Sequence, residues 1–216
     1  MNFICFIIEW TGGIEMKLQL QSNSLEDYLC PIEGVIDFNH PVVKRKIKEI
    51  KARTTSLEKQ AEIAFNYVRD NIEHSFDTNS IEITISASDA IEKKEGICFA
   101  KAHLLAALLR GLGIPTGFCY QRVLRKGTVE SGYALHGLNA LYLEDYGWFR
   151  VDPRGNKEGV YSEFSIEKEK LAYPIREELG EIDYLQVFTE PLSSVINSMQ
   201  DSKDCRELFF KRPEAI

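Results

Sequence analysis

Three residues of this chain have the side chains needed for nucleophilic catalysis. Cys98 follows Gly96-Ile97 and begins a strongly apolar segment, His136 lies in Tyr-Ala-Leu-His-Gly-Leu, and Asp152 ends Gly147-Trp-Phe-Arg-Val-Asp. A thiolate attacks a carbonyl carbon, an imidazole holds and passes the proton, and a carboxylate fixes the tautomer of the imidazole. Cys98, His136 and Asp152 are therefore our candidate catalytic residues, and the chemistry that they indicate is thiol-dependent acyl transfer.

The position of Cys98 also favours a reactive thiol. The free N–H groups and the dipole at a helix N-terminus stabilise a thiolate, and a neighbouring imidazolium stabilises it further. A cysteine beside a leucine-rich helix is often simply buried, which is the alternative for Cys98 and the better interpretation of Cys119, between Phe118 and Tyr120. The downstream His136 and Asp152 favour the catalytic interpretation of Cys98.

Other histidines fit the catalytic role less well. His103 would share a helix with Cys98 and be rotated from it by about 140°, so that the two side chains diverge. We therefore expect His103 to be packed or hydrogen-bonded within the fold. His40 and His74 have no partner signature and are expected to be structural or exposed.

Asp152 precedes Pro153, which favours extended backbone at the end of a strand. A turn at Asp145-Tyr-Gly147 would bring that strand back beside the strand of His136, although His136 lies farther from the turn than Asp152 does. A bulge or a longer loop would have to absorb the difference. Arg154 is a candidate substrate contact or an ordinary loop residue, and Trp148 is a candidate cleft wall or a core residue.

The intervening sequence predicts the elements that position these residues. The capping-box pattern Thr55-Ser-Leu-Glu58 opens a helix expected to end near His74, and Ser86 opens a shorter one ending near Gly96. The segment 98–112 is apolar over most of its circumference, which is typical of a core helix. Strand composition marks 116–124, 138–143 and 148–151, and short helices are expected at 193–199 and 205–210.

Composition limits the classes of function. The 216 residues include 26 basic and 33 acidic side chains, giving a net charge of −7, so nucleic-acid binding is not expected. The five cysteines form neither a disulfide framework nor a zinc motif, which favours a cytoplasmic location. Thiol-dependent acyl transfer implies no metal or organic cofactor, and the sequence has no calcium-loop pattern. The apolar start is too short to span a membrane. Gly12-Gly13 before Met16 resembles a translated ribosome-binding site, so we expect residues 1–15 to be a non-native or disordered extension and 16–216 to form one domain.

Several motifs in order resemble the bacterial transglutaminase-like superfamily. They are Tyr67-Val-Arg-Asp-Asn-Ile72, Gly96-Ile-Cys-Phe-Ala100, the helix ending in Gly-Leu-Gly-Ile-Pro115, His136, and Gly147-Trp-Phe-Arg-Val-Asp-Pro153. The resemblance covers about residues 60–156 and implies a papain-like α+β fold, in which a helical part carrying the cysteine packs on an antiparallel sheet. It maps the nucleophile, base and orienting acid of the family onto Cys98, His136 and Asp152.

The chain departs from the pattern after two of these residues. Gly137-Leu138 replaces the frequent Ala-Trp after the histidine, and Arg154 replaces the Thr of Asp-Pro-Thr. Loss of the Trp would remove one wall that keeps water from an acyl-enzyme, which favours hydrolysis of an amide, peptide or protein substrate. Amine transfer of the transglutaminase type, and a non-catalytic binding module, are the alternatives.

Overall fold

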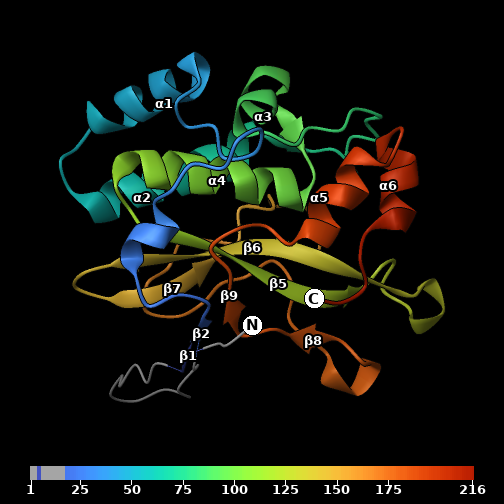
Figure 1. Ribbon diagram of the computed structural model, residues 1–216. Helices are drawn as coiled ribbons and strands as arrows, with labels where there is room; N and C mark the ends of the chain where they lie inside the picture. Colours follow the sequence, from blue (N-terminus) through green and yellow to red (C-terminus); the bar gives the residue numbers. More distant parts are fainter. Residues whose placement is uncertain (1–3, 6–17) are drawn as a thin grey trace.

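The computed structural model describes residues 4–5 and 18–216 (Figure 1). In chain order the strands and helices are β1 (Ile4–Cys5), β2 (Gln19–Leu20), α1 (Pro41–Lys51), α2 (Leu57–Asn71), β3 (Glu73–His74), α3 (Ala87–Lys93), β4 (Glu95–Gly96), α4 (Cys98–Leu112), β5 (Thr116–Leu124), β6 (Tyr133–Leu143), β7 (Gly147–Val151), β8 (Ile182–Asp183), β9 (Gln186–Val187), α5 (Ser193–Gln200) and α6 (Cys205–Lys211). The expected extension 1–15 lies outside the described residues except for β1, which pairs with β2.

A four-stranded antiparallel sheet carries His136 and leads into Asp152. Its strand order is β7-β6-β5-β8, and β5 pairs with β6 from Thr116↔Leu141 to Leu124↔Tyr133. The expected hairpin joins β6 to β7, with Leu143 opposite Gly147. The strand β6 begins well before the predicted residue 138, so His136 lies inside a regular strand.

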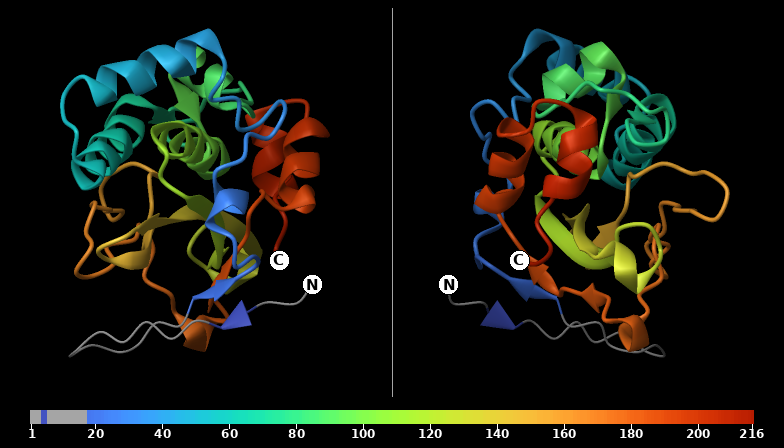
Figure 2. Two further views of the ribbon diagram at one scale, coloured as in Figure 1. Left: turned by 60° about the vertical axis from the view of Figure 1, so that its left-hand side comes forward. Right: turned by 90° about the vertical axis from the view of Figure 1, so that its right-hand side faces the viewer.

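The central helix α4 lies between this sheet and the outer helices. Figure 2 shows α4 nearly end-on. The helices α1, α2 and α3 lie on the side of α4 that faces away from the sheet, and the sheet lies below it. All of its residues except Gly111 are buried, as the apolar sequence predicts, and its C-cap Gly113 adopts the left-handed conformation at φ 86°. Burial along its whole length fixes the position of α4, and with it the position of Cys98 at its N-terminus.

The outer helices begin and end close to their predicted positions. The α2 helix starts at Leu57, so its N-cap is Ser56, one residue after the predicted cap. The Ser56 hydroxyl accepts a hydrogen bond from the Lys59 N–H. The α2 helix ends at Asn71, before His74, which belongs to the short strand β3 instead. Ser86 caps α3 as predicted. No described helix has the length and apolarity needed to cross a bilayer.

Two clusters of buried side chains lie on the two faces of the sheet. The larger one surrounds α4 and includes Phe99, Leu105 and Leu135. The smaller includes Tyr28, Leu138 and Trp148. Mixed helices and strands with an antiparallel sheet confirm the predicted α+β architecture, with the cysteine helix packed on the sheet.

Candidate active site

Cys98 is the first residue of α4, and the chain enters it from an extended Ile97 that provides no side-chain cap. Because no side chain caps the helix, the N–H groups of its first turn remain available beside the Cys98 thiol. The preceding strand β4 is held beside β3, with His74 opposite Gly96. A Cβ on Gly96 would lie 2.8 Å from Thr84 Oγ1 and from Ala100 Cβ, so this tight entry into the helix requires glycine.

The sheet brings His136 and Asp152 together without a bulge. Val151 pairs with Asn139, so continuing the register sets Asp152 opposite Leu138, two residues along β6 from His136. Side chains span such a diagonal offset between antiparallel strands. The Nε2 atom of His136 lies 2.7 Å from Oδ2 of Asp152, and both side chains are buried. The predicted need for a bulge or a longer loop was wrong.

Backbone N–H groups hold the carboxylate of Asp152 from two further directions. The Arg154 N–H donates to Oδ1 and the Ala172 N–H donates to Oδ2, each at 3.0 Å. Burial favours the neutral carboxyl, but the charge and hydrogen bond of His136, together with these N–H groups, keep the pKa of Asp152 below its ordinary value. Asp152 is therefore an ionised carboxylate with a fixed orientation at neutral pH.

Because Nε2 of His136 is bound to Asp152, Nδ1 is the ring nitrogen left to form the hydrogen bond with the Cys98 thiol. Burial acts to lower the pKa of His136, but the charge and hydrogen bond of Asp152 and the contact with Cys98 raise it to about 9. Burial likewise acts to raise the pKa of the Cys98 thiol. The hydrogen bond and charge of His136, the charge of Arg212 and the Gly137 N–H together bring the pKa of Cys98 below its ordinary value. The buried pair therefore favours thiolate and imidazolium.

A cavity of about 550 Å³ opens onto this pair. Cys98 and His136 line it together with Arg154, which was a candidate substrate contact, and with His74, which sequence reasoning treated as structural or exposed. Arg154 donates to both carboxylate oxygens of Asp77 and to the Tyr173 hydroxyl. The structure thus places Arg154 at the cavity and also gives it a structural role.

The sequence did not mark most of the other residues of the cavity wall, among them Tyr173, Phe209 and Arg212. Tyr173 packs edge-on against the His136 ring, with the ring centroids 4.8 Å apart. Phe209 and Arg212 come from α6 and the residue that ends it. No local pattern marks these residues, because only the tertiary fold brings segments 170–176 and 205–212 next to α4.

Trp148, the other candidate substrate contact, does not line the cavity. It packs in the smaller core cluster, where its ring lies 4.8 Å from that of Tyr28 in an edge-on arrangement. Leu138 belongs to the same cluster and is fully buried. The residue after Gly137 therefore cannot form a cavity wall in this chain, and the expected loss of a wall at Leu138 was wrong.

The other cysteine and histidine candidates lie where the sequence indicates. His103 is buried and its Nδ1 atom lies 2.9 Å from the Ile85 carbonyl oxygen. Burial raises the pKa of the buried Cys119 to about 12, which keeps this thiol protonated. Over residues 18–216, no cluster of three His, Cys, Asp or Glu side chains has the arrangement of a metal site.

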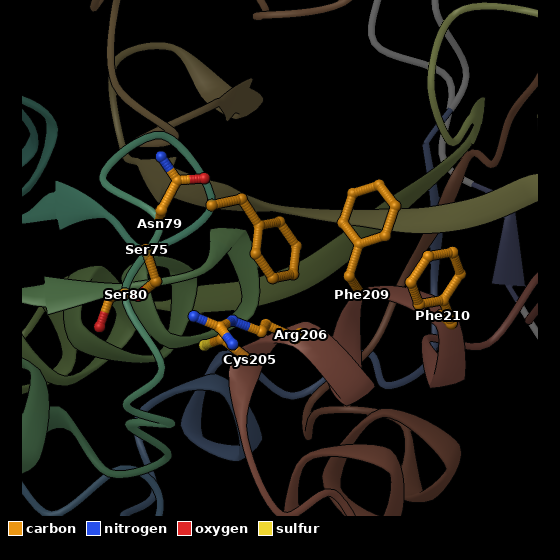
Figure 3. A pocket seen from close by; sticks show the side chains of 8 residues that line it. Ser75, Asn79, Ser80, Cys205, Arg206, Phe209 and Phe210 are labelled. Carbon is orange, nitrogen blue, oxygen red and sulfur yellow. The ribbon is translucent and has the colours of Figure 1, made fainter.

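A second, smaller pocket of about 270 Å³ adjoins the cavity and shares Phe76 and Phe209 with it. Figure 3 shows Phe209 and Phe210 on one side of this pocket, with Ser75, Asn79 and Ser80 on the loop that follows β3. Cys205 and Arg206 form its floor near the start of α6. The aromatic wall between the two hollows is therefore built by α6 and the loop after β3.

Three solved structures are similar to parts of this chain. The "Putative Cysteine Protease" of Cytophaga hutchinsonii has a TM-score of 0.49 at 19% identity, covering 62% of this chain and 43% of that one. The periplasmic domain of TgpA from Pseudomonas aeruginosa has a TM-score of 0.45 at 17% identity, covering 64% and 50%. Red sea bream transglutaminase has a TM-score of 0.36 at 13% identity, covering 70% and 30%.

This chain thus spans less than half the length of the Cytophaga hutchinsonii structure. No curated protein matches the sequence. The sequence model of the transglutaminase-like superfamily matches residues 44–153, a stretch that includes Cys98, His136 and Asp152 and amounts to half of the chain. The protein therefore belongs to the transglutaminase-like superfamily.

Proposed function

We propose that this protein is a thiol hydrolase of amide or peptide bonds, with Cys98 as nucleophile, His136 as base and acid, and Asp152 as the orienting carboxylate. The observation that carries the proposal is the buried His136–Asp152 pair at 2.7 Å beside a thiol of lowered pKa at a helix N-terminus. Members of this superfamily are typically cysteine-dependent enzymes. Burying ionised groups costs free energy, and such groups with shifted pKa values occur mostly at functional sites, which favours an enzyme over a non-catalytic binding module.

The mechanism follows from the roles of the three residues. The Cys98 thiolate attacks the carbonyl carbon, and its own backbone N–H, at the start of α4, donates to the developing oxyanion. The His136 imidazolium gives its proton to the leaving amine, which departs and leaves a thioester on Cys98. His136 then takes a proton from water, the hydroxide attacks the thioester, and the acid is released as the thiolate forms again.

The charges of the cavity favour water over an amine as the acceptor. Six cationic side chains line it: Arg125, Lys126, Arg154, Lys157, Arg176 and Arg212. Only two carboxylates, Asp77 and Glu181, line it with them. A protonated amine such as a lysine side chain is repelled by this excess of positive charge, whereas water is not. Charged walls are also well hydrated, unlike the water-excluding channel that amine transfer needs.

A peptide-library digest followed by mass spectrometry tests the proposal. The wild-type protein should cleave a subset of peptides at neutral pH, and Cys98→Ala and His136→Ala should abolish the cleavage. Asp152→Asn should keep residual turnover, reduced on the order of 10³–10⁴-fold, because the orienting carboxylate is the least costly of the three to lose. Equal cleavage by wild type and Cys98→Ala would exclude the proposed mechanism.

A second experiment identifies the acyl acceptor from the way the acyl-enzyme partitions between water and an amine. With the best substrate from that digest, acid and amide products are measured at rising concentrations of a primary amine. We expect acid to dominate at low millimolar amine. Dominant amide at that concentration would identify an amine transferase instead.

A further inference from the structure

The cations of the cavity contrast with the acidic chain around them. The whole protein has a net charge of −7, yet six cations and two carboxylates surround the approach to Cys98. Local excess of one charge in a concave site raises the concentration of ligands of the opposite charge. The question is which of these cations is available to a ligand.

Most of them already have partners. Arg154 and Lys157 both bind Asp77, and Arg176 binds Glu181. Arg125 donates to the carbonyl oxygens of Phe209 and Tyr133. These contacts commit the four side chains to holding the fold. Lys126 has no carboxylate partner within residues 18–216, but it is exposed and lies over the rings of Phe209 and Phe210.

Arg212 differs from the others. It is the C-cap of α6 and is 9% exposed, and within residues 18–216 no carboxylate forms an ion pair with it, so that of the two cations without a carboxylate partner only Arg212 is buried. Its Nε atom donates a long hydrogen bond of 3.4 Å to the Phe209 carbonyl oxygen. Its guanidinium lies 5.0 Å from the Phe76 ring centroid and 4.9 Å from that of Phe209. The two rings hold the plane of the guanidinium in one place at the cavity wall.

A buried cation without a carboxylate partner is costly unless an anion compensates it. Burial lowers the pKa of Arg212 to about 10, while the charge of Cys98 acts in the opposite direction, so the guanidinium remains charged at neutral pH. In the free protein the Cys98 thiolate supplies a nearby negative charge. Formation of a thioester removes that charge, and Arg212 then has no compensating anion unless the acyl group carries one.

We infer that Arg212 binds a carboxylate of the acyl donor, and that the protein therefore acts on anionic amides or peptides. This inference rests on the proposed function of Cys98. The planar guanidinium suits a carboxylate because it can donate two parallel hydrogen bonds. The carboxylate comes either from an acidic side chain or from the end of a peptide, since both present the same group.

Alkylation of Cys98 by a matched pair of reagents tests the inference without a known substrate. Iodoacetate and iodoacetamide both lose iodide to the attacking thiolate, but only iodoacetate carries a carboxylate. The measured quantity is the ratio of their rate constants at Cys98, followed by peptide mapping. A change in the pKa of Cys98 affects both reagents equally, so the ratio isolates recognition of the anion.

We expect Arg212→Gln to lower the iodoacetate-to-iodoacetamide ratio by about 10-fold, in line with loss of one hydrogen-bonded charge pair. Arg212→Lys should keep part of the preference because it keeps the charge. The matched control is Arg206→Gln, which removes a cation from the same helix but outside the Cys98 cavity, and it should leave the ratio unchanged. An equal fall in Arg206→Gln, or an unchanged ratio in Arg212→Gln, overturns the inference.

Three bromoacetyl reagents distinguish the two sources of the carboxylate. Bromoacetyl-glycine carries a terminal carboxylate, the bromoacetyl derivative of aspartic acid α-amide carries a side-chain carboxylate, and bromoacetyl-glycinamide carries neither. An Arg212-dependent preference for the first or the second assigns the source. Fast reaction of Cys98 with all three and no dependence on Arg212 overturns the inference and leaves the proposed function standing. A Cys98 inert to every reagent overturns both.

Discussion

At the scale of single residues, the candidate site centres on two buried, hydrogen-bonded side chains, Cys98 and His136. Burial alone would keep Cys98 neutral as a thiol and His136 neutral as an imidazole, because a low dielectric disfavours charge. Each is charged because the other is present and because Asp152 adds a fixed negative charge. The reactivity that we propose for Cys98 is therefore a property of the pair.

Replacing His136 should move the pH profile of Cys98. In the wild type, Cys98 should remain a thiolate at pH values below the ordinary pKa of a thiol. The ion pair should be lost as pH rises through the pKa of His136, near 9. In His136→Gln the lowering influence is lost and burial remains, so the midpoint of iodoacetamide labelling should move upward. At pH 7 we expect labelling at least ~10-fold slower, one pKa unit or more.

The matched control for this experiment is His103→Gln, which changes a buried histidine of α4 that bonds the Ile85 carbonyl. Its profile should coincide with that of the wild type. A shifted profile in His103→Gln together with a normal one in His136→Gln would reverse the assignment of the base.

The residues predictable from sequence are those that local patterns mark. Cys98 stands at a helix start between a glycine and an apolar run, and Asp152 stands where a strand meets a proline. Arg212 has no such marker, because its place at the cavity arises from α6 packing beside segments far away in the chain. The same holds for the Ala172 N–H that supports Asp152.

At the scale of elements, the close contact between α4 and β6 sets the position of Cys98, the proposed nucleophile. A Cβ on Gly137 would lie 2.7 Å from Cδ1 and 3.3 Å from Cε1 of Phe99, the residue after Cys98. Asn139 on the same face of the strand donates to the Ala102 carbonyl of α4. The glycine that replaces the usual family alanine therefore matches a large side chain on the helix.

Gly137→Ala should test this contact. Phe99 is 1% exposed and has little room to move, so the added methyl should destabilise the fold by about 1–3 kcal/mol and displace the start of α4. We expect a lower melting temperature and slower labelling of Cys98 by iodoacetamide.

The matched control is Ala140→Gly on the same strand, where a methyl is lost from the smaller core cluster. It should lower the melting temperature and leave the labelling rate of Cys98 unchanged. Normal labelling in Gly137→Ala would show that the α4 contact does not position the thiol.

Long periodic elements were predictable, and most of the two-residue strands were not. The apolar run and the glycine-proline exit define α4, and the turn residues define the β6–β7 hairpin. The two-residue strands β3, β4, β8 and β9 are too short to show an alternating pattern. Their pairing depends on distant partners, as for His74, which β3 places beside Gly96.

At the scale of the whole molecule, one arginine joins the sheet to the long segment that completes the site. Arg150 on β7 is 1% exposed and binds both carboxylate oxygens of Glu169 and of Asp183 at 2.7–2.9 Å. Asp183 lies on β8, at the opposite edge of the sheet from β7. The segment between Glu169 and Asp183 contains Ala172 and Tyr173, which contact Asp152 and His136.

Arg150→Met should therefore weaken both the fold and the site. Removing one partner of a buried ion pair typically costs 3–5 kcal/mol, but Glu169 and Asp183 are 22% and 28% exposed and keep part of their hydration. We expect a loss of about 2–3 kcal/mol in the free energy of unfolding, measured by urea denaturation. Turnover should fall as well, because a loosened segment no longer holds Ala172 against the carboxylate of Asp152.

Lys170→Met is the matched control, since Lys170 lies in the same segment and forms an exposed ion pair with Glu163. Exposed pairs contribute little to stability, so its denaturation midpoint and turnover should equal those of the wild type. If Arg150→Met unfolds at the wild-type urea concentration, the segment is held by its other contacts. If instead it loses stability but keeps full turnover, the Ala172 N–H is not needed to orient Asp152, and His136 and the Arg154 N–H suffice to hold the carboxylate.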